Sequence, residues 1–168
     1  MRSTFAPSIA CLYMWNVEES HILSARNPFR ENIGHWRRYI DDILITWTGT
    51  ITEANTFFDW INSFDPYLKF THHISESELL FLDLLITIQD GILPAKTFSK
   101  ATDRNSLLRH ETHHTKAFRT NLPYGQFLQI RRNCSQLYDY NQQAQSLSEK
   151  LARKGYLPHT VETAQKRA

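Results

Sequence analysis

The sequence has few cysteines and no long run of apolar residues. Cys11 and Cys134 are its only cysteines, which excludes a disulfide framework, and they lack the spacing of a zinc site. We therefore expect two reduced thiols in an intracellular protein. The longest apolar stretch, residues 79–88, is interrupted by Asp83 and is too short to cross a bilayer, so we expect no membrane association.

An excess of charge of one sign is also lacking. The chain has 19 Lys and Arg against 17 Asp and Glu, so its total charge does not indicate a nucleic-acid partner. The basic residues nevertheless concentrate from Lys96 to the end. Hydrophobic residues make up 41% of the sequence, which is enough for a packed core in one domain and part of a second.

Two adjacent carboxylates, Asp41 and Asp42, stand between β-branched and aromatic residues that are typical of a buried strand. Burying an ionised carboxylate is costly unless it is paired or binds a metal. Carboxylate oxygens suit Mg²⁺, and such a pair at a strand–turn–strand position indicates a two-metal nucleotidyl-transfer centre. The alternative is an ordinary hairpin turn, because turns favour aspartate on their own account. The dipeptide alone leaves both interpretations open.

Hydrophobic periodicity predicts alternating helices and strands in the first hundred residues. We expect helices over 7–23 and 52–64, a hairpin around Asp41 and Asp42, strands over 67–75 and 80–88, and a turn at Asp90 and Gly91. This order of elements over one core predicts an α+β fold. Periodicity does not select one α+β fold among several.

The pattern becomes helical after about residue 100. Apolar residues recur at three- and four-residue steps at Leu137, Tyr140, Ala144, Leu147 and Leu151. We expect this amphipathic helix to end at Gly155, and Thr160 to cap a last helix that runs to Arg167. With a further helix over 126–135, these elements predict a three-helix unit of the helix-turn-helix kind.

Several segments, taken in order, resemble the motifs of reverse transcriptases. They are Phe5-Ala6-Pro7-Ser8, Tyr39-Ile40-Asp41-Asp42, Phe81-Leu82-Asp83-Leu84 and the stretch 96–107. The sequence most resembles the Penelope-like retroelement polymerases. That resemblance includes His113, Pro123-Tyr124-Gly125-Gln126, Arg131-Arg132-Asn133-Cys134-Ser135 and Lys154-Gly155-Tyr156. It spans nearly the whole chain, and ordered motifs are more specific together than any one alone.

The resemblance implies a fold and an activity. It implies a partial reverse transcriptase palm over 1–100, an antiparallel sheet with helices, and a helical, helix-turn-helix-like thumb over 101–168. The implied activity is RNA-directed DNA polymerisation with Mg²⁺ or Mn²⁺ as cofactor. An RNA template and a DNA primer would be the partners, and the nucleus the location.

The resemblance also assigns roles to particular residues. Asp41 would be the main metal ligand, with Asp42 beside it, and Tyr39 would abut the primer end. The side chains beside the incoming nucleotide would be those of Phe5, Ala6 and Pro7. Phosphates of the primer or template would be bound by Lys100 and Arg104, and in the thumb by Lys116, Arg131 and Arg132. Such phosphate contacts are sensitive to salt and blind to base sequence.

The sequence also departs from the family. Reverse transcriptases carry a further carboxylate on an earlier strand, preceded by the fingers, whereas this chain begins inside the later motif. We therefore expect a fragment that is inactive alone and that depends on a missing N-terminal half of the polymerase. The alternative is a non-catalytic helix-turn-helix module, derived from a retroelement, that binds nucleic acid.

A second metal motif occurs by spacing alone. Residues 110–114 match the HExxH pattern, in which one helix presents two zinc ligands and a general base. The flanking residues Arg109, Thr115 and Lys116 are polar, and no third ligand stands at a recognised spacing. We therefore expect this match to be accidental.

Overall fold

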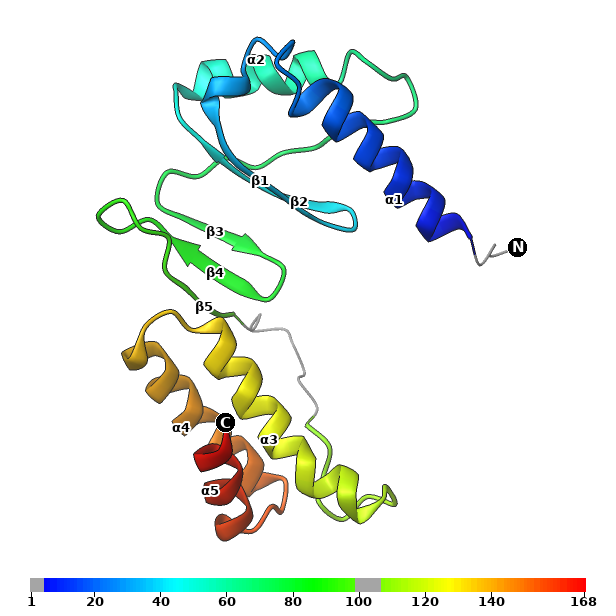
Figure 1. Ribbon diagram of the computed structural model, residues 1–168. Helices are drawn as coiled ribbons and strands as arrows, with labels where there is room; N and C mark the ends of the chain where they lie inside the picture. The colour runs from blue at the N-terminus through cyan, green and yellow to red at the C-terminus, as the bar shows by residue number, and fades with distance from the viewer. Residues whose placement is uncertain (1–4, 99–106) are drawn as a thin grey trace. The chain divides into compact units, whose positions relative to one another are not determined.

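The computed structural model describes residues 5–98 and 107–168. These residues form five α-helices and two antiparallel sheets (Figure 1), so the expected α+β class is confirmed. The chain divides into two compact units, one ending at Ile74 and the other beginning at Ser75. This division precedes residue 100 because the last short strand bonds to the helical region: the N–H of Ala95 donates to Ser135 Oγ at 3.0 Å.

The first unit begins with α1 (Ala6–Val17), which continues into a π-helical turn (Glu18–Ile22). Pro7 stands in the first turn of α1, where its missing N–H is not needed. Next, β1 (Ile33–Tyr39) pairs in antiparallel fashion with β2 (Asp42–Trp47). The predicted helix and hairpin are therefore both present.

Helix α2 (Ile51–Ile61) starts at a capping box. The N–H of Glu53 donates to Thr50 Oγ1 at 3.2 Å, and the N–H of Thr50 donates to Glu53 Oε2 at 2.7 Å. These bonds lower the pKa of the Glu53 carboxyl. The apolar face of the helix joins the hairpin in the core of the unit, which consists of Val17, Ile22, Ile33, Trp36, Phe57 and Ile61.

The strand predicted over 67–75 is wrong, because this segment is neither helix nor strand. Its backbone bonds to one side chain instead of to a neighbouring strand. The N–H of Phe70 donates to Asn62 Oδ1 at 2.7 Å, and Asn62 Nδ2 donates to the Phe70 carbonyl at 3.0 Å. These two bonds occupy backbone groups that a sheet partner would need.

The second unit contains the three-stranded sheet β3 (Glu78–Phe81), β4 (Leu84–Thr87) and β5 (Ala95–Thr97). The single strand predicted over 80–88 is thus a hairpin, reversed at Leu82 and Asp83, where Leu82 has a φ of +54°. Apolar alternation concealed the reversal because one of the turn residues is itself apolar. The predicted turn at Asp90 and Gly91 is confirmed: both residues have positive φ.

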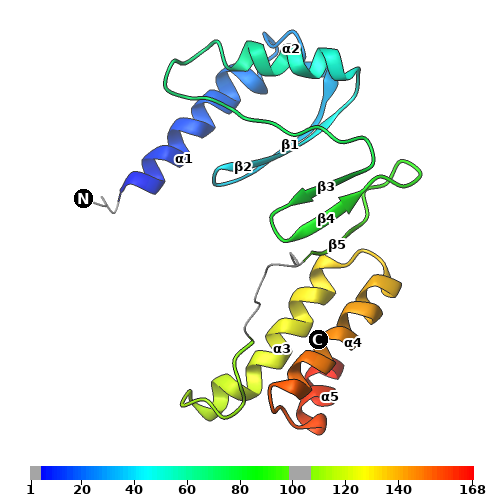
Figure 2. The ribbon, with the colours of Figure 1, turned by 180° about the vertical axis from the view of Figure 1, so that it is seen from behind.

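Three helices complete this unit: α3 (Lys116–Asn133), α4 (Leu137–Arg153) and α5 (Pro158–Arg167). They enclose a second core made of Phe127, Ala144, Leu147, Leu151, Tyr156, Val161 and Ala164. Both ribbon views show α4 and α5 beside α3 (Figures 1 and 2). No helix in the described parts of the chain is long and apolar enough to span a membrane.

The ends of these helices differ in part from the prediction. The amphipathic helix does end before Gly155, whose φ is +85°. Helix α3 starts ten residues before the expected 126. Pro123, which the sequence predicts to lie in a turn, is instead buried inside the helix. Thr160 does not cap α5; the helix begins at Pro158, and Leu157 is the N-cap residue.

Candidate functional site

Asp41 and Asp42 lie at the tip of the β1–β2 hairpin. Tyr39 pairs with Asp42 across the ladder, which leaves Ile40 and Asp41 as the two turn residues. Ile40 has a φ of +56°, in the left-handed region that β-branched residues rarely adopt. Strained backbone of this kind clusters at functional sites, so the turn itself is an observation that points to function.

Both carboxylates are exposed, so the expectation that they are buried is wrong. The core of the unit reaches Trp36 and Ile43 but not the turn, and Ile40 is 63% exposed. Among the described residues, neither carboxylate accepts a hydrogen bond or joins an ion pair. The pair is therefore accessible to an external cation.

A nearly buried ion pair lies behind this tip. Glu18, which is 7% exposed, accepts hydrogen bonds from Arg38 at Oε1 (2.6 Å) and Oε2 (3.3 Å). The same Oε1 accepts a bond from the indole N–H of Trp36 at 2.9 Å. The hydrogen bonds that Arg38 donates to Glu18 raise the pKa of the Arg38 guanidinium. This fork-to-fork geometry fixes the orientation of both side chains.

The ion pair is also connected to the turn. Arg38 Nη1 donates to the carbonyl of Ile40 at 3.1 Å, so one guanidinium bonds to the π-helical turn after α1 and to the strained residue before Asp41. The sequence analysis missed this role. A glutamate within an apolar helical segment, and an arginine three residues before Asp41, were the signals that could have revealed it.

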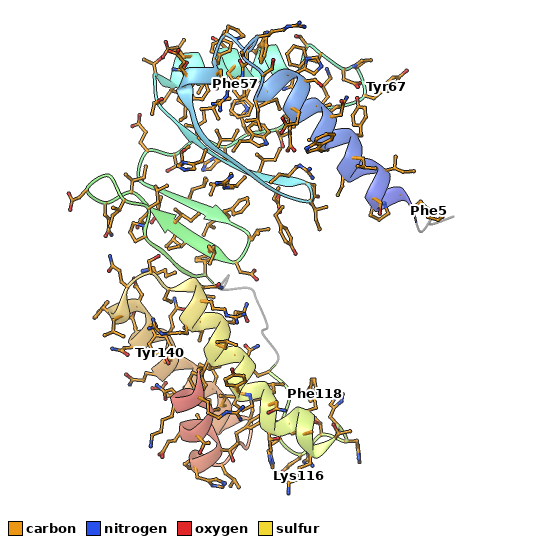
Figure 3. All side chains as sticks on the ribbon, in the orientation of Figure 1. Phe5, Phe57, Tyr67, Lys116, Phe118 and Tyr140 are labelled. Atoms are coloured by element: carbon orange, nitrogen blue, oxygen red, sulfur yellow. The ribbon has the colours of Figure 1, made fainter. Side chains whose placement is uncertain are left out.

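The residues predicted to lie beside the nucleotide form the exposed start of α1. Phe5 is 71% exposed, and Figure 3 shows it at the N-terminal end of this helix, followed by Ala6 and Pro7. Glu18, the residue that contacts the hairpin, is at the other end. The structure thus brings Tyr39, Asp41 and Asp42 together at one tip. The block that begins at Phe5 lies at the opposite end of α1 from Glu18.

The basic residues predicted to contact nucleic acid are exposed on α3. Lys116 is the first residue of the helix, whereas Arg131 and Arg132 are in its last turn (Figure 3 labels Lys116). An 18-residue helix is about 27 Å long, so the two ends would contact separate phosphates. Lys100 and Arg104 lie outside the described residues.

Residues 107–168 together carry ten Lys and Arg but four Asp and Glu. This excess of six positive charges exceeds that of the whole chain, and all of the basic side chains except Arg109 belong to α3, α4, α5 and the turns between them. A basic surface attracts phosphate without reading base sequence. The helical region is therefore the more basic part of the chain.

The segment that matches the HExxH pattern is not helical. Residues 110–114 form turns and bends, so they cannot present two ligands from one helix face. The carbonyl of His110 instead accepts a bond from Arg119 Nη1 at 2.7 Å. Within residues 5–98 and 107–168, no group of three or more His, Cys, Asp or Glu side chains is placed to hold a metal.

Comparisons of the chain with protein-family models, with curated proteins and with solved structures found no match in any of the three. The functional argument therefore rests on the hairpin tip, on the ion pair behind it and on the basic helices.

Proposed function

We propose that the chain is part of a retroelement reverse transcriptase. In this proposal the β1–β2 hairpin supplies two carboxylates to the metal centre, and the helical second unit binds the template and primer through their phosphates. One observation carries the proposal: Asp41 and Asp42 stand exposed and unpaired at a strained two-residue turn that is hydrogen-bonded to a nearly buried ion pair.

The donor set at this tip fits a hard divalent cation. Mg²⁺ is usually held by one or two carboxylates together with waters and substrate phosphates. Two such ions, when bound, would activate the primer 3′-hydroxyl and neutralise the leaving pyrophosphate. The task of the protein is to hold Asp41 and Asp42 in place, and Arg38 does so through the carbonyl of Ile40. Tyr39 directly precedes the turn and is exposed, as a contact to the primer end requires.

Two carboxylates do not complete a two-metal centre. We propose that a further carboxylate comes from a polymerase segment that is not among these residues, and that the chain by itself does not extend a primer. Extending the reading frame upstream of the Met1 codon tests this directly. The expected result is a strand that bears an aspartate, preceded by a basic fingers region.

Primer extension by the longest reading frame that contains this chain tests the catalytic assignment. Asp41→Asn should lower the rate at least about a hundredfold, because a metal ligand contributes several kcal/mol to the transition state. Asp90→Asn is the matched control, since Asp90, like Asp41, is an exposed acid in a turn. Equal rates for both variants would contradict the proposal.

A second candidate is a nucleic-acid-binding module without catalysis. The observation in its favour is the connection between α4 and α5, a four-residue turn (154–157) with Gly155 at φ +85°. Short turns of this kind join the helices of helix-turn-helix domains. If residues 75–168 alone keep the full affinity of the chain for nucleic acid, and the longer reading frame has no metal-dependent activity, the module is favoured over the enzyme.

A further inference from the structure

A hollow of about 230 Å³ lies between α3 and α5 in the second unit. It is lined by Thr120, Asn121 and Tyr124 of α3 and by His159, Thr160, Thr163, Ala164 and Arg167 of α5. Thr120 and Tyr124 are four residues apart, so they share one face of α3. His159, Thr163 and Arg167 repeat the same step along α5. The hollow is therefore a groove between two helix faces.

The charge around this groove is positive. None of the residues that line it is acidic. The Arg167 guanidinium carbon lies 4.7 Å from the centre of the Tyr124 ring, and Arg167 forms no ion pair with any described residue. Stacking on the ring holds the guanidinium in place but leaves its N–H edges available. Lys116, four residues before Thr120 on α3, extends the same helix face.

The hydrogen bonds determine which groups remain available to a ligand. The hydroxyl of Thr120 donates to the Lys116 carbonyl at 3.0 Å, and that of Thr163 donates to the His159 carbonyl at 2.7 Å. Because both hydroxyl protons are already donated within their own helices, the two threonines contribute only short, neutral side chains to the lining of the groove. Among the described residues, the side chains of Asn121 and Arg167 form no hydrogen bond with another protein group, so both can donate to a ligand.

We propose that this groove, the α3–α5 groove, binds one phosphodiester group of a nucleic-acid strand. Arg167 and Asn121 would donate to its non-bridging oxygens. Small-molecule sites begin at about 300 Å³, so the groove is too small for a whole nucleotide and suits one phosphate with its sugar. The inference rests on the proposed function for its partner, and it adds a contact away from the last turn of α3, where Arg131 and Arg132 lie.

The test is fluorescence anisotropy with the full chain and a fluorescein-labelled oligothymidylate of about twelve nucleotides, a length within the range of single-strand sites. Arg167→Ala should weaken binding roughly tenfold at low salt, the size of one charge-assisted contact. It should also reduce the salt slope by about 0.7, the value for one phosphate on a single strand.

Arg153→Ala is the matched control, because Arg153 is an exposed arginine in the last turn of α4 and lies 3.9 Å from Glu149. We expect it to change the affinity less than about twofold. If the two arginine variants weaken binding equally, the groove is not a site and the effect is one of net charge alone.

A second pair of variants blocks the groove and keeps Arg167 in place. Thr163→Glu places a carboxylate on the α5 wall, whereas Gln145→Glu adds the same charge at an exposed position of α4. We expect Thr163→Glu to weaken binding as much as Arg167→Ala does, with an unchanged helical circular dichroism signal. Equal effects of the two glutamate variants would overturn the proposal.

Two further outcomes separate the groove from the proposed function. If the chain binds the oligonucleotide and only Arg131→Ala weakens it, the groove is excluded while the nucleic-acid partner stands. If the chain binds no oligonucleotide, both fail. The last experiment titrates inorganic phosphate alone and follows the NMR resonance of the Asn121 side-chain amide. If phosphate saturates the groove and the oligonucleotide does not displace it, the groove is a site for free phosphate and does not bind a nucleic-acid strand.

Discussion

The two units of this protein place their charges differently. In the first, Arg38 and Glu18 form a nearly buried pair, and two exposed carboxylates stand beyond it at a single tip. In the second, the ion pairs among the described residues are longer, at 3.5 Å for Lys96–Asp139 and 3.9 Å for Arg153–Glu149. The first unit therefore fixes the position of a few charged groups, whereas the charges of the second unit are held loosely.

The largest expected effect is a loss of stability that is confined to one unit. Phe57→Ala and Phe127→Ala each remove a fully buried ring, one from each core, and each should lower the free energy of unfolding by about 3–5 kcal/mol. Urea denaturation followed by tryptophan fluorescence should detect the first variant more strongly, because all four tryptophans precede residue 75. A single shared transition for both variants would show that the two units unfold together.

The next effect concerns the ion pair in the first unit. Glu18→Gln leaves the Arg38 guanidinium without a counter-charge at a largely buried position, so we expect a loss of about 2–3 kcal/mol. The exposed pair of the second unit provides the control: Glu149→Gln should cost less than about 0.5 kcal/mol. Thermal denaturation measures both, and similar losses would remove the contrast between the two units.

A smaller effect is expected on affinity. Replacing Arg131 or Arg132 by alanine should reduce the salt slope of single-strand binding by about 0.7 each, with little change in stability, because both side chains are exposed. Arg37→Ala, an exposed arginine of the first unit, is the comparison. If all three variants change the slope alike, nucleic-acid affinity is not confined to the helices.

The smallest effect concerns pH. The folded-state pKa of Glu53 is lowered by its bonds to Thr50, so its contribution is present above the unfolded-state pKa and is lost as the pH falls through the folded-state value. Glu53→Gln should therefore differ most from the wild type near neutral pH and converge with it in acid. Thermal midpoints measured across this pH range provide the test, and a constant difference would exclude the linkage.

Local patterns predicted part of the structure. The hairpin around Asp41 and the amphipathic helix that starts at Leu137 were correct, because strand alternation and helical repeats are properties of short segments. The segment 67–75 alternates like a strand but bonds to Asn62, a contact that only the folded chain reveals. Pro123 had the appearance of a turn residue, and packing around it overrides that local signal.

The sequence predicted the hairpin that carries Asp41 and Asp42 but not the environment of the two carboxylates. Asp41 lies in the hairpin turn and Asp42 is the first residue of β2 beside it, yet both are exposed, since apolar neighbours in the sequence do not guarantee burial at a turn. The bond from Arg38 to Glu18 joins residues 20 positions apart, and no local pattern links them. The α3–α5 groove depends on helix packing and could not be predicted from either helix alone.

Ile40 has a consequence for how this fold could change. A β-branched residue at φ +56° costs stability, and glycine would adopt the same conformation without that cost. Because Ile40 is mostly exposed, its replacement by glycine would forfeit little packing. We therefore expect Ile40→Gly to raise the thermal stability of the protein. The more flexible tip would also hold the two carboxylates less firmly. Stability and activity are expected to trade against each other at this single position.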